Sequence, residues 1–144
     1  MKNQDFNCSI TAQISVEKAM LAISHVSDWW AKDFTGRAEK LNDEFTVKFG
    51  ETFVTFRITE FIPDEKIAWT VIDCFLHWIN DKTEWTGTKV IFEFSTKNNQ
   101  TTIMFTHHGL APQVECYNDC VKGWTGYLTG SLKKLLTDSI GQPS

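Results

Sequence analysis

TTIMFTHHGLAPQVECYNDCVKGWTGYLTGSLKKLLTDSIG, residues 101–141, changes its hydrophobic pattern part-way along. Its first eight residues carry apolar side chains at alternate positions, which is typical of a half-buried strand. From Val114 onward, apolar residues recur at intervals of three and four, which predicts a helix. Pro112 suits the first helical position, and Gly141 suits the residue after the end. The predicted helix has about 28 residues and is roughly 42 Å long, so it needs a sheet to pack against.

The residues before this stretch supply the sheet. FNCSITAQI (6–14) alternates like a strand, and SVEKAMLAISHVSDWW (15–30) changes to helical spacing. Between residues 34 and 108 strand patterns alternate with turns, and KNNQ (97–100) is the expected loop of a hairpin. The order is one strand, short helices, about six further strands and a long helix, in a single domain over residues 1–144. It predicts the α+β class, with a curved antiparallel sheet around the C-terminal helix and, as a further inference, a cavity between them.

Composition limits the classes of function. The chain has 144 residues, a formal net charge of −4 and a single adjacent basic pair, Lys133-Lys134, so a basic footprint for nucleic acid is missing. No apolar run is long enough for a membrane span. Aromatic residues make up 13% of the chain, with 11 Phe, 6 Trp and 2 Tyr. This much ring surface predicts either a bulky core or a cavity with aromatic walls.

The N-terminal residues bear on the compartment. Residues 1–5 (MKNQD) lead into a strand pattern and not into the apolar block of a signal peptide. We therefore expect a cytoplasmic protein whose four cysteines are reduced.

Four stretches together resemble a known family. They are ITAQISVEKAMLAISHVSDWWAKDFTG (10–36), FTVKFG (45–50), IAWTVIDCFLHWINDKTEWTGTKVIFEF (67–94) and FTHHGLAPQVECYNDCVKGWTGYLTGSLKKLL (105–136). They are similar to bacterial homologues of the activator of heat-shock protein 90 ATPase. These homologues belong to the wider helix-grip superfamily, with the lipid-transfer START domains and the birch pollen allergen.

The resemblance implies a helix-grip fold. Its members have a sheet of about seven antiparallel strands that grips a long C-terminal helix over an apolar cavity, with two short helices after the first strand. The superfamily includes lipid carriers, hormone receptors, cyclases and co-chaperone domains, so the fold alone assigns no activity. The eukaryotic co-chaperone has an additional N-terminal domain, and we do not expect one in this chain.

The cysteines and histidines near the predicted helix raise the question of a metal site. Cys116 and Cys120 are four residues apart and face the same side of a helix, and His107 or His108 is close in sequence. Neither C-x-x-C nor H-E-x-x-H spacing is present, and both cysteines flank the apolar face of the helix. We expect them to be small buried residues, with no metal and no cofactor.

Some polar residues share the phase of buried ones. His107 follows Ile103 and Phe105 at alternate positions, which predicts an inward side chain that is either a hydrogen-bonded structural group or a ligand contact. Glu60 and Asp73 are also in phase with apolar residues of their strands. The alternative is that the alternation of inward and outward side chains shifts by one residue near these two strand ends, so that the carboxylates reach solvent.

Aromatic and glycine residues add two further hypotheses. Trp30 follows the short helices, where we expect either a core residue or the rim of a cavity; Trp78 and Trp85 flank a polar hairpin loop with partner contact as the alternative. Gly123, Gly126 and Gly130 interrupt the predicted helix at about 1 kcal/mol each relative to Ala. Close approach of a strand, a bend, or space for a ligand would each offset that cost.

The sequence favours a non-enzymatic role, because it contains no nucleophile elbow, P-loop or dinucleotide fingerprint. The first hypothesis is binding of a small, largely apolar or aromatic ligand between sheet and helix. The second is an interaction module that contacts a chaperone, and a distant third is a cyclase or hydrolase. Neither the ligand nor the oligomeric state follows from the sequence. The candidate cavity residues are Trp30, Phe56, Glu60, Trp69, Asp73, Phe92, Phe105, His107, Tyr117, Cys120, Trp124 and Tyr127.

Overall fold

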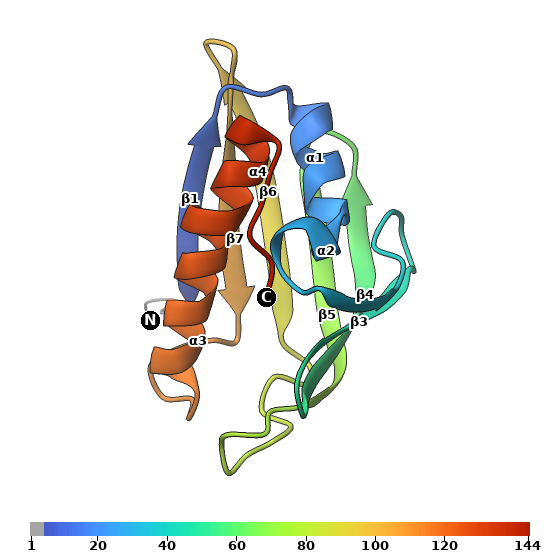
Figure 1. The fold of residues 1–144 in the computed structure, drawn as a ribbon, viewed down its shortest axis with the longest axis vertical. Helices are drawn as coiled ribbons and strands as arrows, with labels where there is room; N and C mark the ends of the chain where they lie inside the picture. Colours follow the sequence, from blue (N-terminus) through green and yellow to red (C-terminus); the bar gives the residue numbers. More distant parts are fainter. Residues whose placement is uncertain (1–4) are drawn as a thin grey trace.

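A seven-stranded antiparallel sheet with the spatial order β1-β7-β6-β5-β4-β3-β2 forms the framework of the computed structural model, which describes residues 5–144 (Figure 1). The strands are β1 (Phe6–Ala12), β2 (Asp33–Gly36), β3 (Glu44–Phe49), β4 (Thr52–Ile62), β5 (Lys66–Phe75), β6 (Lys89–Lys97) and β7 (Gln100–His108). The helices are α1 (Val16–Ser24), α2 (Val26–Trp29), α3 (Tyr117–Thr125), η1 (Gly126–Leu132) and α4 (Lys133–Asp138). The predicted α+β helix-grip fold is confirmed.

The helices cover one face of the sheet, and the other face is turned away from them (Figure 1). On that other face, threonine hydroxyls of neighbouring strands form hydrogen bonds, as in the 2.8 Å contact between Thr46 and Thr55. The predicted hairpin between β6 and β7 turns at Asn98 and Asn99, which both have positive φ, as a two-residue hairpin turn requires. None of the helices within residues 5–144 has the length and apolar character needed to span a bilayer.

The C-terminal helix starts later than predicted. The helical run covers 22 residues from Tyr117 to Asp138, so the predicted start at Pro112 is wrong. Residues 112–116 form turns, because the Glu84 carboxylate accepts hydrogen bonds from the amides of Glu115 and Cys116. The helix ends at Ser139, which adopts the left-handed conformation, and not at Gly141.

The middle of this helix differs from a regular α-helix. Residues Gly126–Leu132 form a π-helical segment, η1, in one continuous run with α3 and α4. A Cβ atom added at Gly123, Gly126 or Gly130 would meet nothing within 4 Å outside the helix's own backbone, so close approach of a strand is not the reason for these glycines. Local π-helical geometry is frequent at functional sites, and it occurs here next to open space.

Two irregularities change which side chains face the helix. The register of the β4–β5 pair shifts between Thr55 and Phe56 and again between Ile58 and Glu60. As a result, Asp73 is exposed, and Glu60 forms a 3.2 Å ion pair with Lys66. The prediction that both carboxylates face inward is therefore wrong, and the phase-slip alternative holds.

The C-terminal tail folds back onto the end of α2, in the centre of the view in Figure 1. Ser144 donates its amide to the carbonyl of Trp30 at 3.0 Å, and its carbonyl accepts the Lys32 amide at 2.9 Å. Ser131, in the π-helical segment η1, donates its hydroxyl to the carbonyl of Trp29 in α2 at 2.6 Å. These contacts hold the segment that carries Trp30 in place.

Replacing Gly141 with alanine tests this packing. An added methyl group would overlap the carbonyl oxygen of Asp28, so we expect Gly141→Ala to destabilise the protein by about 1–3 kcal/mol. The matched control is Gly126→Ala, which meets open space and should be neutral or stabilising by up to about 1 kcal/mol. Urea denaturation of the two variants measures both effects. Equal stability of Gly141→Ala and the unmodified protein would contradict the packed tail.

Candidate ligand pocket

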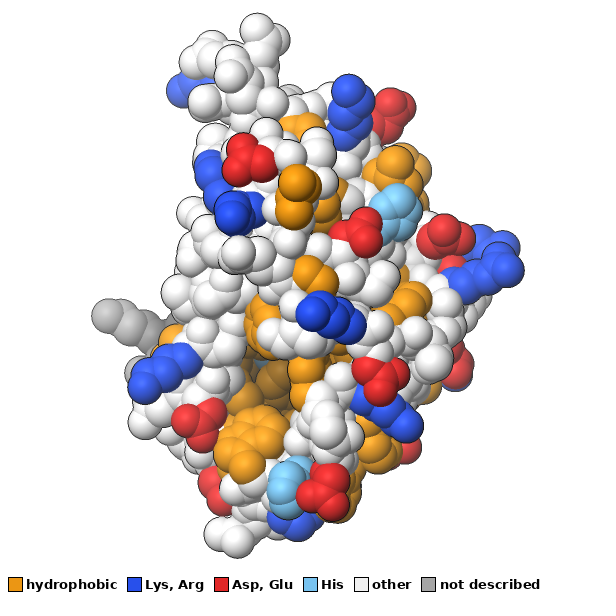
Figure 2. All heavy atoms as spheres, in the orientation of Figure 1, with side chains coloured by type: hydrophobic (Ala, Val, Ile, Leu, Met, Phe, Trp, Pro, Cys, Tyr) orange, Lys and Arg blue, Asp and Glu red, His pale blue; other side chains and the backbone are white. Residues whose placement is uncertain are grey.

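A pocket of about 310 Å³ lies between the C-terminal helix, the residue after α2, the end of β3 with the start of β4, and the β5–β6 loop. Figure 2 shows hydrophobic side chains gathered around a hollow in the lower half of the molecule. The lining residues are Trp30, Phe49, Thr52, Val54, Leu76, Trp78, Trp85, Asp119, Cys120, Gly123, Trp124 and Tyr127. The volume is at the lower end of the range for small-molecule sites.

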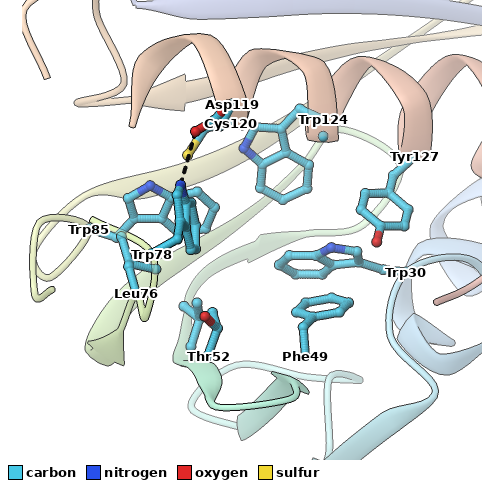
Figure 3. Close-up of a pocket in the computed structure, with 12 residues that line it drawn as sticks. Trp30, Phe49, Thr52, Leu76, Trp78, Trp85, Asp119, Cys120, Trp124 and Tyr127 are labelled. Atoms are coloured by element: carbon cyan, nitrogen blue, oxygen red, sulfur yellow. Dashed lines mark hydrogen bonds between the residues drawn. The ribbon is translucent and has the colours of Figure 1, made fainter. Parts of the chain in front are cut away.

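Aromatic rings form most of the wall (Figure 3). Trp30 is the centre of one side, with its ring centroid 4.8 Å from that of Trp124 and 6.0 Å from that of Phe49. Tyr127, from the π-helical segment, is 6.2 Å from Phe49. Trp78 lies across the hollow from these rings and comes from the β5–β6 loop. The pocket therefore depends on four separate parts of the chain: the segment after α2, the β3–β4 hairpin, the β5–β6 loop and the C-terminal helix.

The loop is attached to the start of the helix by two carboxylates. Glu84 accepts the amides of Glu115 and Cys116 at 2.8 and 3.0 Å. In return Glu115 accepts the amides of Asn80 and Asp81 at 2.8 and 3.0 Å, and these hydrogen bonds lower the pKa of its carboxyl group. This reciprocal arrangement holds the loop against the pocket.

His107 is buried behind the pocket and does not line it. Its Nδ1 accepts the indole N–H of Trp124 at 3.0 Å, so the proton of the neutral ring is on Nε2. That nitrogen donates to the Thr88 hydroxyl at 2.9 Å, which in turn donates to the carbonyl of Trp85 at 2.6 Å. Burial lowers the pKa of His107 to about 3. The structural alternative for His107 fits these contacts, because its ring positions two tryptophans of the pocket.

Cys116 and Cys120 form a disulfide, so the expectation that all four cysteines are reduced is wrong for this pair. Their Cα atoms are 5.7 Å apart, within the range for a disulfide, because they are one helical turn apart. Both are buried, as predicted, and the Cys116 sulfur accepts the indole N–H of Trp85 at 3.2 Å. Cys8 and Cys74 are free. Residues 5–144 contain no group of three or more side chains that could hold a metal ion.

A family model described as Activator of Hsp90 ATPase homolog 1-like protein matches residues 16–137. The chain belongs to this family. The resemblance drawn from the sequence stretches is thus confirmed. None of the curated proteins matches the chain significantly.

Solved structures agree with membership of the Hsp90-activator homologue family. The Aha1 dimer from Colwellia psychrerythraea matches with a TM-score of 0.75 and 26% identity, over 92% of this chain and 95% of that one. A conserved protein of unknown function from Enterococcus faecalis matches with a TM-score of 0.71 and 14% identity, over 99% and 78%. A protein from Mesorhizobium loti matches with a TM-score of 0.70 and 15% identity, over 93% and 98%. The last two likenesses concern the fold alone.

In this family member, the structure brings together four of the predicted site residues and separates the others. Those that line the pocket are Trp30, Cys120, Trp124 and Tyr127. Those that pack in the solid core beside it are Phe56, Trp69, Phe92 and Phe105. Tyr117 is half-buried at the first turn of α3 and is not among the lining residues, and Glu60 and Asp73 lie outside the pocket.

Sequence reasoning missed most of the pocket lining. Asp119 and Gly123 are on the same helical face as Cys120 and Tyr127, so the helical period contains the signal that would have found them. The sequence places Trp78 only at the flank of a polar hairpin loop, with partner contact as the alternative. Its place in the pocket depends on how that loop attaches to the helix, which no local pattern encodes.

The buried His107 should make stability depend on pH. Its pKa is lower in the folded protein than the ordinary 6.5, so the unfolded state binds the extra proton. This contribution to stability is complete above pH 6.5 and is lost as the pH falls toward 3, at up to about 1.4 kcal/mol per pH unit.

We expect the free energy of unfolding to fall by about 2 kcal/mol more in the unmodified protein than in His107→Gln between pH 6.5 and pH 5. Urea denaturation at the two pH values measures this difference. His107→Gln is less stable at pH 7, since a buried hydrogen-bond network is disturbed. The same pH dependence in both proteins would show that His107 is not the titrating group.

Proposed function

We propose that this member of the Hsp90-activator homologue family binds a small, largely apolar ligand in the pocket between sheet and C-terminal helix. The observation that carries the proposal is an aromatic-walled pocket of about 310 Å³ at a helix whose Gly123 faces open space. A glycine at an interior helix position costs about 1 kcal/mol relative to alanine. Space for a ligand offsets that cost where no strand approaches.

Catalysis has less support in this pocket. Burial lowers the pKa of His107 to about 3, and its two ring nitrogens are used by Trp124 and Thr88. Cys120 is in a disulfide and offers no thiolate nucleophile. A binding role uses the same walls without requiring a reactive group.

A second candidate is a protein-interaction module of the Hsp90-activator type. Membership of the family favours it, and so does the exposure of Trp78, whose side chain is about half accessible at the rim of the pocket. A large exposed aromatic residue is a common contact residue in protein interfaces. In this case the partner would cover the mouth of the pocket.

Filling the pocket separates the two candidates. We expect Gly123→Leu to weaken ligand binding by at least about tenfold, because the new side chain enters the hollow that the ligand needs. Its stability should be unchanged or higher, since leucine favours the helix. The control Gly126→Leu adds the same side chain where it does not line this pocket.

Native mass spectrometry followed by organic extraction is the measurement. The proposal expects a stoichiometric small molecule in the unmodified protein and in Gly126→Leu, and its loss in Gly123→Leu. An equal amount of the molecule in all three proteins would contradict binding in this pocket. A clean mass in all three, with capture of a chaperone that depends on Trp78, would favour the interaction module.

A further inference from the structure

The charge in the pocket is of one sign. Among its lining residues, Asp119 is the single one with a formally charged side chain, and lysine, arginine and histidine are absent from that set. One carboxylate oxygen of Asp119, Oδ2, accepts the indole N–H of Trp78 at 3.0 Å (Figure 3). The other oxygen has no partner within the described part of the chain. It is available to a ligand at the mouth of the pocket.

The indole rings present carbon and π surface to the ligand. Three of the four pocket tryptophans use their N–H groups inside the protein: Trp78 on Asp119, Trp85 on the Cys116 sulfur and Trp124 on His107. The faces of such rings carry partial negative charge, and tryptophan is the aromatic residue that attracts a cation most strongly. The walls and the carboxylate therefore favour the same sign of charge.

Two lysines near the pocket, Lys82 and Lys122, do not line it. The Lys82 ammonium donates to the carbonyls of His77 and Ile79 and lies 5.8 Å from the centre of the Phe75 ring. Lys122, three residues after Asp119, forms no ion pair with it and borders a separate hollow beside Tyr127. Neither lysine is among the residues that line the pocket.

The pocket offers an anionic ligand few favourable contacts. Among residues 5–144, the pocket donors without an acceptor are the N–H of Trp30 and the hydroxyls of Thr52 and Tyr127, and all three are uncharged. A ligand carboxylate in this pocket would find only uncharged donors and would lie near the negative charge of Asp119. Most of the free-energy cost of removing it from water would therefore remain uncompensated. A cation with apolar substituents would instead contact ring faces and the free carboxylate oxygen.

We propose that the ligand of this pocket is an organic cation, an ammonium group with apolar or aromatic substituents, whose charge lies at Asp119 among the tryptophan rings. This inference rests on the proposed function and adds the chemical class of the ligand. It goes beyond apolar binding because an apolar wall alone does not distinguish a cation from a neutral molecule of the same shape.

Three probes of similar shape test the charge. They are benzyltrimethylammonium, its neutral carbon isostere neopentylbenzene, and the anion 4-tert-butylbenzoate. Titrations followed by tryptophan fluorescence give the dissociation constants. We expect the cation to bind at least about tenfold more tightly than the neutral isostere, and the anion to bind most weakly.

Asp119→Asn removes the charge and keeps an oxygen that accepts from Trp78. It should weaken binding of the cation by about five- to tenfold and leave the neutral probe within about twofold. The control Asp138→Asn removes an exposed carboxylate from α4, outside the pocket, and should change neither value. A loss that affects cation and neutral probe equally would overturn the role of the charge.

The outcomes separate this inference from the function on which it rests. If the neutral probe binds as tightly as the cation and Gly123→Leu abolishes both, the pocket binds ligands and the cation proposal is overturned. If none of the three probes binds, the cation proposal is overturned and the extraction experiment alone decides the proposed function. Preference for the cation, lost in Asp119→Asn and in Gly123→Leu, supports both.

Discussion

The buried imidazole of His107 joins β7 to the two parts of the chain that line one end of the pocket, α3 and the β5–β6 loop. It belongs to β7, accepts the N–H of Trp124 from α3, and reaches the loop through Thr88 and the carbonyl of Trp85. The ring of Trp85 also meets it edge-on, with centroids 4.6 Å apart. Because burial keeps the ring neutral, one nitrogen must donate and the other must accept. The accepting nitrogen pairs with the N–H of Trp124 and the donating nitrogen with the hydroxyl of Thr88, and these two contacts fix how the helix and the loop meet.

The late start of the helix is part of the same arrangement. An α-helix leaves its first amides without partners, and a carboxylate there is favoured by their hydrogen bonds and by the helix dipole. In this structure Glu84 is such a carboxylate and comes from the loop, so the residues around Cys116 are satisfied without further helical turns toward Pro112. Ordering the loop costs conformational entropy. The hydrogen bonds that Glu84 accepts from the amides at the helix start offset this cost. The loop is thus held where Trp78 and Trp85 can wall the pocket.

The fold was predictable from sequence because it depends on periods that persist over many residues. Alternation in strands such as β7 and the helical stripe after Val114 both mark one buried face, and the structure has both elements. The positions that sequence reasoning misplaced depend on single residues or on distant ones. One irregularity in the β4–β5 pair turns Asp73 outward, and one distant carboxylate moves the helix start. Half-way along the helix, nothing in the glycine spacing distinguishes a bend from a π-helical segment.

The large aromatic content predicts either a bulky core or a cavity, and in the structure Trp30 lies between the aromatic core and the pocket. On one side Trp30 stacks on Trp69, with ring centroids 6.3 Å apart and an interplanar angle of 7°. Trp69 packs against Phe45, Phe56 and Phe92, and its indole N–H has no hydrogen-bond partner among the described residues. A buried donor of this kind costs about 1–3 kcal/mol, which dense ring packing must offset. On its other side Trp30 borders the pocket, held by the tail at its carbonyl. The pocket wall on this side is therefore a ring that packs against the aromatic core, with Phe56 5.6 Å and Trp69 6.3 Å from it between ring centroids.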